Sequence, residues 1–181
     1  IQDGRRFLEV ANKVSRDKPV LVLKSGKSEA GQQASMSHTG SIAGSHEAYQ
    51  AAFRRSGVME AVDQQEMNDL ARAFGSGQPL PKGRNVVVVT NAGGPGILTT
   101  DGAEKHGLSL ADLTQETRDK LKAFLPAAAS VKNPIDLLGD ATSDRFEAAT
   151  RILLADPNVD GILAVATPQS MTDSEEIARK L

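Results

Sequence analysis

Runs of consecutive apolar residues predict the strands of this chain. Val20–Leu23 and Val86–Thr90 are continuous apolar runs, typical of parallel strands that are covered on both faces. Val159–Thr167 predicts a further strand, and Val58–Val62 and Leu108–Leu113 predict shorter ones. The expected strands are therefore spread along the whole chain.

Between these runs, apolar positions recur every three or four residues, which is the period of a helix. Capping patterns predict where two of the helices begin, because Asp63 precedes Glu66 by three residues and Thr172 precedes Glu175 by three. Thr114 predicts a further helix start. The expected helices cover residues 7–16, 44–56, 64–74, 95–106, 115–124 and 143–154 and the end of the chain.

Two segments show neither period and are expected to be loops. Lys24–Ser41 is polar, with glycines at positions 26, 31 and 40, and it follows the first buried strand. Pro126–Asp140 is the second long loop. Within it, Asn133–Asp136 predicts an Asx-Pro turn and a short extended segment. Asp136 could contact a loop or a ligand, and a structural role is favoured.

Strands that alternate with helices predict a doubly wound α/β fold with parallel sheets. Residues 75–83 are rich in Gly and Pro and predict a linker between two units, 1–82 and 83–181. In such folds ligands gather at the carboxyl ends of the strands. The loops that follow Leu23 and Thr90 are therefore the candidate binding segments.

Composition narrows the function classes. The 181 residues carry a formal net charge of −2 and contain no cysteine, so disulfides and thiolate chemistry are excluded and no basic nucleic-acid surface is implied. Aromatic residues make up only 3%, which disfavours stacking on bases. No apolar run approaches the length of a membrane span, and no signal peptide is expected. These features predict a cytoplasmic protein without nucleic-acid or membrane partners.

The histidines at positions 38, 46 and 106 have different surroundings. His46 shares an apolar stripe with Tyr49 and Phe53, which predicts a partly buried, hydrogen-bonded core residue. His106 lies at the end of a helix, where a cation interacts favourably with the helix dipole. His38 follows no apolar period and is surrounded by small hydroxyl and glycine residues. From the pattern alone, a surface loop residue and a phosphate-handling nucleophile both remain open.

The turn Gly93–Gly96 follows a buried strand and opens a helix. It lacks the third glycine of the dinucleotide fingerprint and the Lys-Ser/Thr of a P-loop. It is either a tight structural turn or an anion-binding nest of N–H groups. No His, Asp and Glu spacing is typical of a metal site, so none built by the protein is expected.

Three ordered motifs now indicate a family. Ser37–Gly44, Thr90–Gly96 and Asn133–Leu137, together with Asp156–Asp160, resemble the NDP-forming acyl-CoA synthetases, which are related to succinyl-CoA synthetase. The resemblance extends over essentially the whole chain. It implies two flavodoxin-like, succinyl-CoA synthetase-like parallel-sheet units, both incomplete. Residues 1–82 would be the C-terminal half of the histidine-bearing domain, and residues 83–181 most of the next one.

The resemblance also implies a reaction, in which acid, CoA and ATP interconvert with acyl-CoA, ADP and phosphate. An acyl phosphate forms first, and its phosphoryl group passes to the histidine that matches His38. Ser37, Thr39, Gly40 and Ser41 would contact the phosphate around His38. Gly93, Gly94 and Gly96 would open one of two phosphate-facing helices.

Other parts of such an enzyme are implied as partners. They are a CoA-binding domain, an ATP-grasp domain or subunit for ATP or ADP with Mg²⁺, and a glutamate upstream of Ile1 that orients the histidine. The substrate would be a short-chain carboxylic acid or its acyl-CoA, and the intact enzyme an oligomer. The fragment alone is expected to bind no cofactor and to be inactive.

Two alternatives belong to other functional classes. Some protein lysine acetyltransferases carry the same region as a non-catalytic acyl-CoA-sensing module, although His38 in an intact Ser-His-Thr-Gly-Ser context favours the ligase. A flavodoxin-like flavin-binding module is the other, and it is disfavoured because no aromatic residue flanks either loop.

Overall fold

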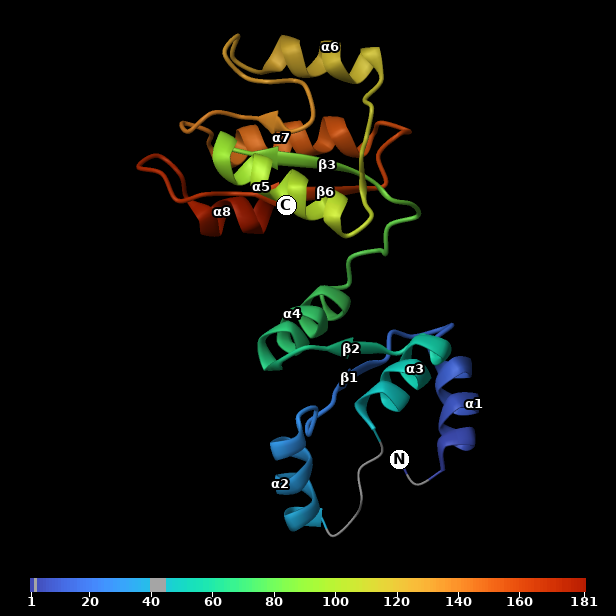
Figure 1. The fold of residues 1–181 in the computed structure, drawn as a ribbon. Coiled ribbons are helices and arrows are strands. Elements are labelled where there is room, and N and C mark those ends of the chain that lie inside the picture. The colour runs from blue at the N-terminus through green and yellow to red at the C-terminus, as the bar shows by residue number, and fades with distance from the viewer. Residues whose placement is uncertain (2, 40–44) are drawn as a thin grey trace. The chain divides into compact units, whose positions relative to one another are not determined.

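The computed structural model describes residues 1, 3–39 and 45–181 and, within these ranges, every side chain except those of Ser35, Met36, His38 and Thr39. Contacts between residues divide the chain into two compact units, Ile1–Pro79 and Leu80–Leu181 (Figure 1). We call them unit 1 and unit 2. Both contain parallel strands connected through helices, which confirms the predicted α/β class.

Unit 1 has two parallel strands, β1 (Leu21–Leu23) and β2 (Met59–Ala61). Its helices are α1 (Gly4–Val14), α2 (Glu29–Thr39), α3 (His46–Ser56) and α4 (Gln64–Gly75). The core of the unit joins α1, α3 and the strands, with Ala11, Phe53 and Val58 buried and Phe7, Val20, Val22 and Tyr49 packed against them.

Side chains fix the helix ends of unit 1 where the sequence predicts them. Ser45 caps α3 by accepting a hydrogen bond from the Ala48 N–H, and Gly57 ends the helix in the left-handed conformation, with φ of 70°. Asp63 caps α4 by accepting a hydrogen bond from the Glu66 N–H, as predicted, but the Glu66 carboxylate accepts from the Val62 N–H and not from the Asp63 N–H of a full capping box.

Two expectations for unit 1 are wrong. Residues 29–39 form helix α2 within the expected polar loop. The segment contains good helix formers, and the Ser28 hydroxyl accepts a hydrogen bond from the Gly31 N–H at 3.1 Å, which supports its first turn. Strand β1 is only partly buried, with Leu23 38% exposed, so it is not covered on both faces as expected.

Unit 2 is built around β3 (Asn85–Thr90), whose last five residues are buried. On one side β3 pairs with β6 (Gly161–Val165), and on the other with β4 (Ser109–Leu110) at its start and β5 (Ile135–Asp136) at its end, all parallel. The helices are α5 (Gly93–Lys105), α6 (Gln115–Phe124), α7 (Ser143–Leu154) and α8 (Ser174–Lys180). Phe146, Leu121, Ile135, Leu137 and Leu153 are fully buried in its core.

Asn133 closes the gap between β4 and β5 along the edge of β3. Its Oδ1 accepts a hydrogen bond from the Val88 N–H at 3.0 Å, and its Nδ2 donates to the Val86 carbonyl at 2.8 Å. The extended segment that follows is confirmed as β5. The Asx-Pro turn is wrong, because the side chain of Asn133 pairs with a neighbouring strand in place of its own turn.

The start of α8 differs from the prediction by one residue. Asp173, rather than Thr172, caps the helix by accepting a hydrogen bond from the Glu176 N–H at 2.9 Å. Thr172 instead accepts a hydrogen bond from the buried side chain of Asn91 at 3.3 Å. This tertiary partner removes Thr172 from the cap.

Candidate functional site

The candidate site of unit 2 lies where β3 ends and α5 begins. The turn is held by Thr90, whose buried hydroxyl accepts a hydrogen bond from the Ala92 N–H and donates one to the Ala92 carbonyl, at 3.1 and 3.0 Å. Ala92 is the N-cap of α5 and provides no side-chain hydrogen bond. The N–H groups of the first turn therefore keep their capacity to bind an anion.

The three predicted phosphate-contacting glycines of this turn have different surroundings. A methyl group on Gly96 would come within 2.8 Å of Thr90 Cγ2, so Gly96 allows α5 to pack closely on β3. Gly94 has open space at this position. A methyl group on Gly93 would lie 3.8 Å from Oδ2 of Asp136. Two of the glycines are therefore exposed to solvent in the turn, and one has a packing role.

Sequence reasoning missed Asn91, which immediately precedes the turn and is 2% exposed. Its Nδ2 donates to the Thr167 carbonyl at 2.9 Å, and its Oδ1 accepts hydrogen bonds from the N–H and hydroxyl of Thr167 at 2.8 and 2.9 Å. Asn91 thus joins the end of β3 to the segment that follows β6. A polar residue directly after a buried strand was the available signal, but its partner lies 76 positions away in the sequence.

The end of β5 places Asp136 beside the same turn. Asp136 pairs with Thr90 in the sheet, and the Leu137 N–H donates to the Thr90 carbonyl at 2.7 Å. The Asp136 Oδ1 accepts a hydrogen bond from the N–H of Leu138, a residue with an unusual positive φ of 72°. Asp136 therefore makes the predicted structural contact, through Leu138, and its carboxylate also lies near Gly93 in the first turn of α5.

Arg145 on α7 holds the segment after β5. It donates to the Leu137 carbonyl at 2.8 Å and pairs with Asp140 at 2.6 Å. The hydrogen bond from Arg145 keeps the pKa of the exposed Asp140 carboxyl below its ordinary value. The guanidinium of Arg145 therefore binds the segment between β5 and α7, through Leu137 and Asp140.

In unit 1 the structure places the backbone of Ser37, His38 and Thr39 in the last turn of α2. The hydroxyl of Ser37 donates to the Gln33 carbonyl at 3.0 Å, one turn earlier in the helix. The predicted phosphate-contacting residues Gly40 and Ser41 lie outside the described residues, as does Ile42 of the expected apolar stripe. The expectation of a loop at His38 is wrong for its backbone.

The other two histidines have the expected positions. His46 is the first residue of α3 and is partly buried, as predicted. Its Nδ1 is buried but finds no hydrogen-bond partner among the described residues, so the expected satisfied histidine is not observed. His106 is the C-cap residue of α5 and is exposed, which confirms its place at the helix end.

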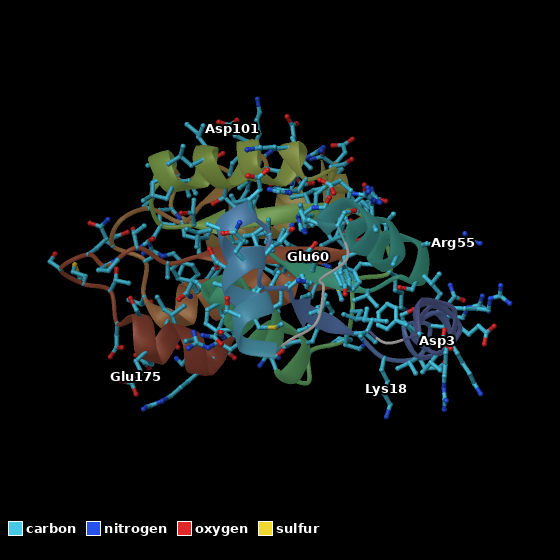
Figure 2. All side chains as sticks on the ribbon, turned by 60° about the horizontal axis from the view of Figure 1, so that its bottom comes forward. Asp3, Lys18, Arg55, Glu60, Asp101 and Glu175 are labelled. Carbon is cyan, nitrogen blue, oxygen red and sulfur yellow. The ribbon has the colours of Figure 1, made fainter. Side chains whose placement is uncertain are left out.

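Of the charged side chains labelled in Figure 2, those of Arg55, Asp101 and Glu175 are exposed on helices α3, α5 and α8. Within residues 1, 3–39 and 45–181, no three His, Asp or Glu side chains gather as metal ligands would. In the same described part of the chain, no helix combines the length and the apolar character needed to cross a membrane.

Comparison with known domains divides the chain in two. Residues 1–74 match a succinyl-CoA ligase-like flavodoxin domain, and residues 86–172 match a ligase-CoA domain.

Comparison with curated proteins finds ADP-forming ligases. The chain is 51% identical over 178 residues to the alpha subunit of acetate–CoA ligase [ADP-forming] II of Pyrococcus furiosus. It is 47% identical over 173 residues to acetate–CoA ligase [ADP-forming] I of Archaeoglobus fulgidus. These alignments include 97% and 96% of this chain, but they span only 38% and 25% of the two relatives.

Comparison with solved structures supports the fold. A dinucleotide-forming acetyl-coenzyme A synthetase 1 of Ca. Korarchaeum cryptofilum, in complex with phosphate and ADP, superimposes with a TM-score of 0.88 at 37% identity. The match covers 98% of this chain and 38% of that one.

Proposed function

Because the chain belongs to the NDP-forming acyl-CoA synthetases of the succinyl-CoA ligase-like family, we propose that it is part of an acid–CoA ligase. The enzyme would interconvert acid, CoA and ATP with acyl-CoA, ADP and phosphate. The observation that carries this proposal is the 51% identity to an ADP-forming acetate–CoA ligase subunit over 97% of the chain.

The proposed chemistry has three balanced steps. Phosphate attacks the acyl carbon of acyl-CoA, and the thiolate of CoA leaves to give an acyl phosphate. A ring nitrogen of His38 then attacks the phosphorus, and the free carboxylate leaves. Finally, the terminal oxygen of ADP attacks the phosphohistidine, which forms ATP and regenerates the imidazole.

Each proposed site residue serves the transfer of a charged group. Gly93 and Gly94 would offer first-turn N–H groups to the phosphate, while Gly96 holds α5 against β3. Ser37, Thr39, Gly40 and Ser41 would surround the phosphoryl group on His38. Phosphoryl transfer depends mostly on positioning and charge stabilisation, which fits a site made of small residues and helix ends.

The remaining components would come from other parts of the enzyme. We propose a CoA-binding domain and an ATP-grasp domain or subunit that binds ATP or ADP with Mg²⁺. The intact enzyme would be a cytoplasmic oligomer. In this arrangement residues 1–82 form the C-terminal half of the histidine-bearing domain and 83–181 most of the following one. The relatives reported above are named ligases, which supports a ligase over an acyl-CoA-sensing region of an acetyltransferase.

Steady-state kinetics of the full-length enzyme test the proposal. With acetyl-CoA, phosphate and ADP supplied, we expect the appearance of ATP and acetate in equal amounts, dependent on all three substrates. A panel of short acyl-CoA compounds then defines the acid. A full-length protein that forms no ATP from any of them would exclude the ligase.

A further inference from the structure

The carboxylate of Asp136 is held next to the first turn of α5. The residue ends β5 directly beside Thr90, which ends β3. Its Oδ1 is fixed by the Leu138 N–H at 2.9 Å, and its Oδ2 lies 3.8 Å from the position of a methyl group on Gly93. A negative charge is therefore placed where the helix end favours an anion.

This carboxylate has no cationic partner in the part of the chain that the structure describes. The nearby Arg145 instead donates to the Leu137 carbonyl and pairs with Asp140. The charge of Asp136 is therefore not neutralised by Arg145 and can attract or repel a ligand bound at the first turn of α5.

Resting on the proposed function, we propose that Asp136 is a specificity-determining residue that selects phosphate over fully deprotonated tetrahedral anions such as sulfate. Inorganic phosphate keeps at least one proton near neutral pH and can donate that hydrogen bond to the Asp136 Oδ2. Sulfate has no proton to donate, so it would meet the carboxylate as a bare like charge.

The physical basis is that helix N–H groups do not distinguish between such anions. They donate to any tetrahedral oxyanion, and the helix dipole favours both. Discrimination therefore requires a group that attracts one anion and repels the other. A fixed acceptor does both, because a protonated oxygen makes a charge-assisted hydrogen bond to it and a bare oxygen does not.

The test compares phosphate and sulfate binding by titration calorimetry at pH 7 in the full-length enzyme. We expect wild type to bind phosphate more tightly than sulfate, and Asp136→Asn to lower this selectivity by about tenfold or more, since one charge-assisted hydrogen bond is lost. Asn retains an oxygen for the Leu138 N–H. Asp140→Asn is the matched control, because it removes a carboxylate from the same loop and should leave the selectivity unchanged.

Asp136→Ala repeats the test without an amide donor, and thermal melting identifies any variant that is unfolded. Unchanged selectivity in a folded Asn or Ala variant would overturn the inference, as would a wild-type enzyme that binds both anions equally. ATP formation from acyl-CoA, assayed in parallel, separates the two proposals. If wild type forms no ATP, the ligase function fails, while the titrations still decide the role of Asp136.

Discussion

Two of the three glycines in the first turn of α5, Gly94 and Gly96, differ in the space around them. A methyl group on Gly96 would meet Thr90 Cγ2 at 2.8 Å, whereas one on Gly94 meets nothing within 4 Å. Thr90 cannot easily move, because it is 1% exposed and its hydroxyl is hydrogen-bonded to Ala92. Gly96 is therefore required by packing and Gly94 is not.

We expect Gly96→Ala to lower the free energy of unfolding by about 1–3 kcal/mol, the usual cost of overpacking. Gly94→Ala should leave it unchanged or raise it by up to about 1 kcal/mol, because Ala favours the helix. Urea denaturation measures both, and equal effects of the two substitutions would contradict this packing. Reduced phosphate affinity in Gly94→Ala would then report on the site rather than on the fold.

Asp156 is a buried carboxylate that accepts hydrogen bonds from Thr114, at the start of α6, and from Asn158, two residues further along the chain. It is 3% exposed and accepts from the N–H and hydroxyl of Thr114, at 2.9 and 3.0 Å, and from the Asn158 N–H at 2.9 Å. Burial raises the pKa of the Asp156 carboxyl, but the hydrogen bonds from Thr117, Asn158 and Thr114 outweigh it and hold the pKa below its ordinary value.

A lowered folded-state pKa means that the charged carboxylate stabilises the protein. This contribution is fully present above the unfolded-state pKa of about 3.9 and is lost as the pH falls through the lower folded-state value. We expect Asp156→Asn to cost about 1.5–3 kcal/mol at pH 7 and progressively less below about pH 4. Urea denaturation at pH 7 and below about pH 4 measures this cost, and Asp119→Asn, at an exposed carboxylate, is the control. A cost that stays constant with pH would contradict the charged state.

At the scale of the elements, the sheet of unit 2 depends on a side chain as well as on strands. Asn133 supplies an acceptor to the Val88 N–H and a donor to the Val86 carbonyl, between the residues of β3 that pair with β4 and those that pair with β5. Both backbone groups belong to a buried strand. Without the amide, the Val88 N–H would lose its partner, whereas the Val86 carbonyl would keep its hydrogen bond from the Ala111 N–H.

We expect Asn133→Ala to cost about 1–3 kcal/mol of unfolding free energy, because the buried Val88 N–H loses its partner. Asn158→Ala is the matched control. It removes one exposed hydrogen bond from the side chain to the Asp112 carbonyl, at 2.8 Å, and should cost about 1 kcal/mol or less. Thermal or urea denaturation decides, and similar costs for the two variants would contradict a bridging role.

The local signals in the sequence predicted most elements, because caps, glycine ends and apolar periods act over a few residues. Asp63, Ser143 and Gly57 all stand at or next to the expected helix ends. The missed features depend on distant partners or on weak patterns. Helix α2 lacks an apolar stripe. Thr172 does not cap α8 because its hydroxyl accepts a hydrogen bond from Asn91, a residue 81 positions earlier in the sequence.

For the candidate site too, the sequence predicted the local features and missed the contacts between distant residues. Gly93, Gly94 and Gly96 follow a buried strand and open a helix, which a local pattern reveals. The side chain of Asn91 bonds Thr167, and the pairing of β5 with β3 brings Asp136 beside the turn. No spacing along the chain indicates either contact. The role of His38 came from the family resemblance, since the pattern left it open.

For the whole molecule, the main observation is how much of the relatives lies beyond the matched region. The chain spans 38% of the Pyrococcus furiosus subunit and 25% of the Archaeoglobus fulgidus enzyme. We propose that the nucleotide and CoA sites belong to those other regions. We therefore expect the 181-residue chain alone to show no acid–CoA ligase turnover. Measurable turnover by this chain would contradict the placement of the nucleotide and CoA sites in other regions.

The most direct test of the central claim is to detect a phosphoryl group on His38 in the full-length enzyme. After incubation with ATP labelled in its terminal phosphate, we expect a protein-bound label that is labile in acid, stable in base and transferable to ADP. His38→Asn should abolish the label, whereas the control variants His46→Asn and His106→Asn should retain it. A label that persists in folded His38→Asn would contradict the proposed phosphoryl carrier.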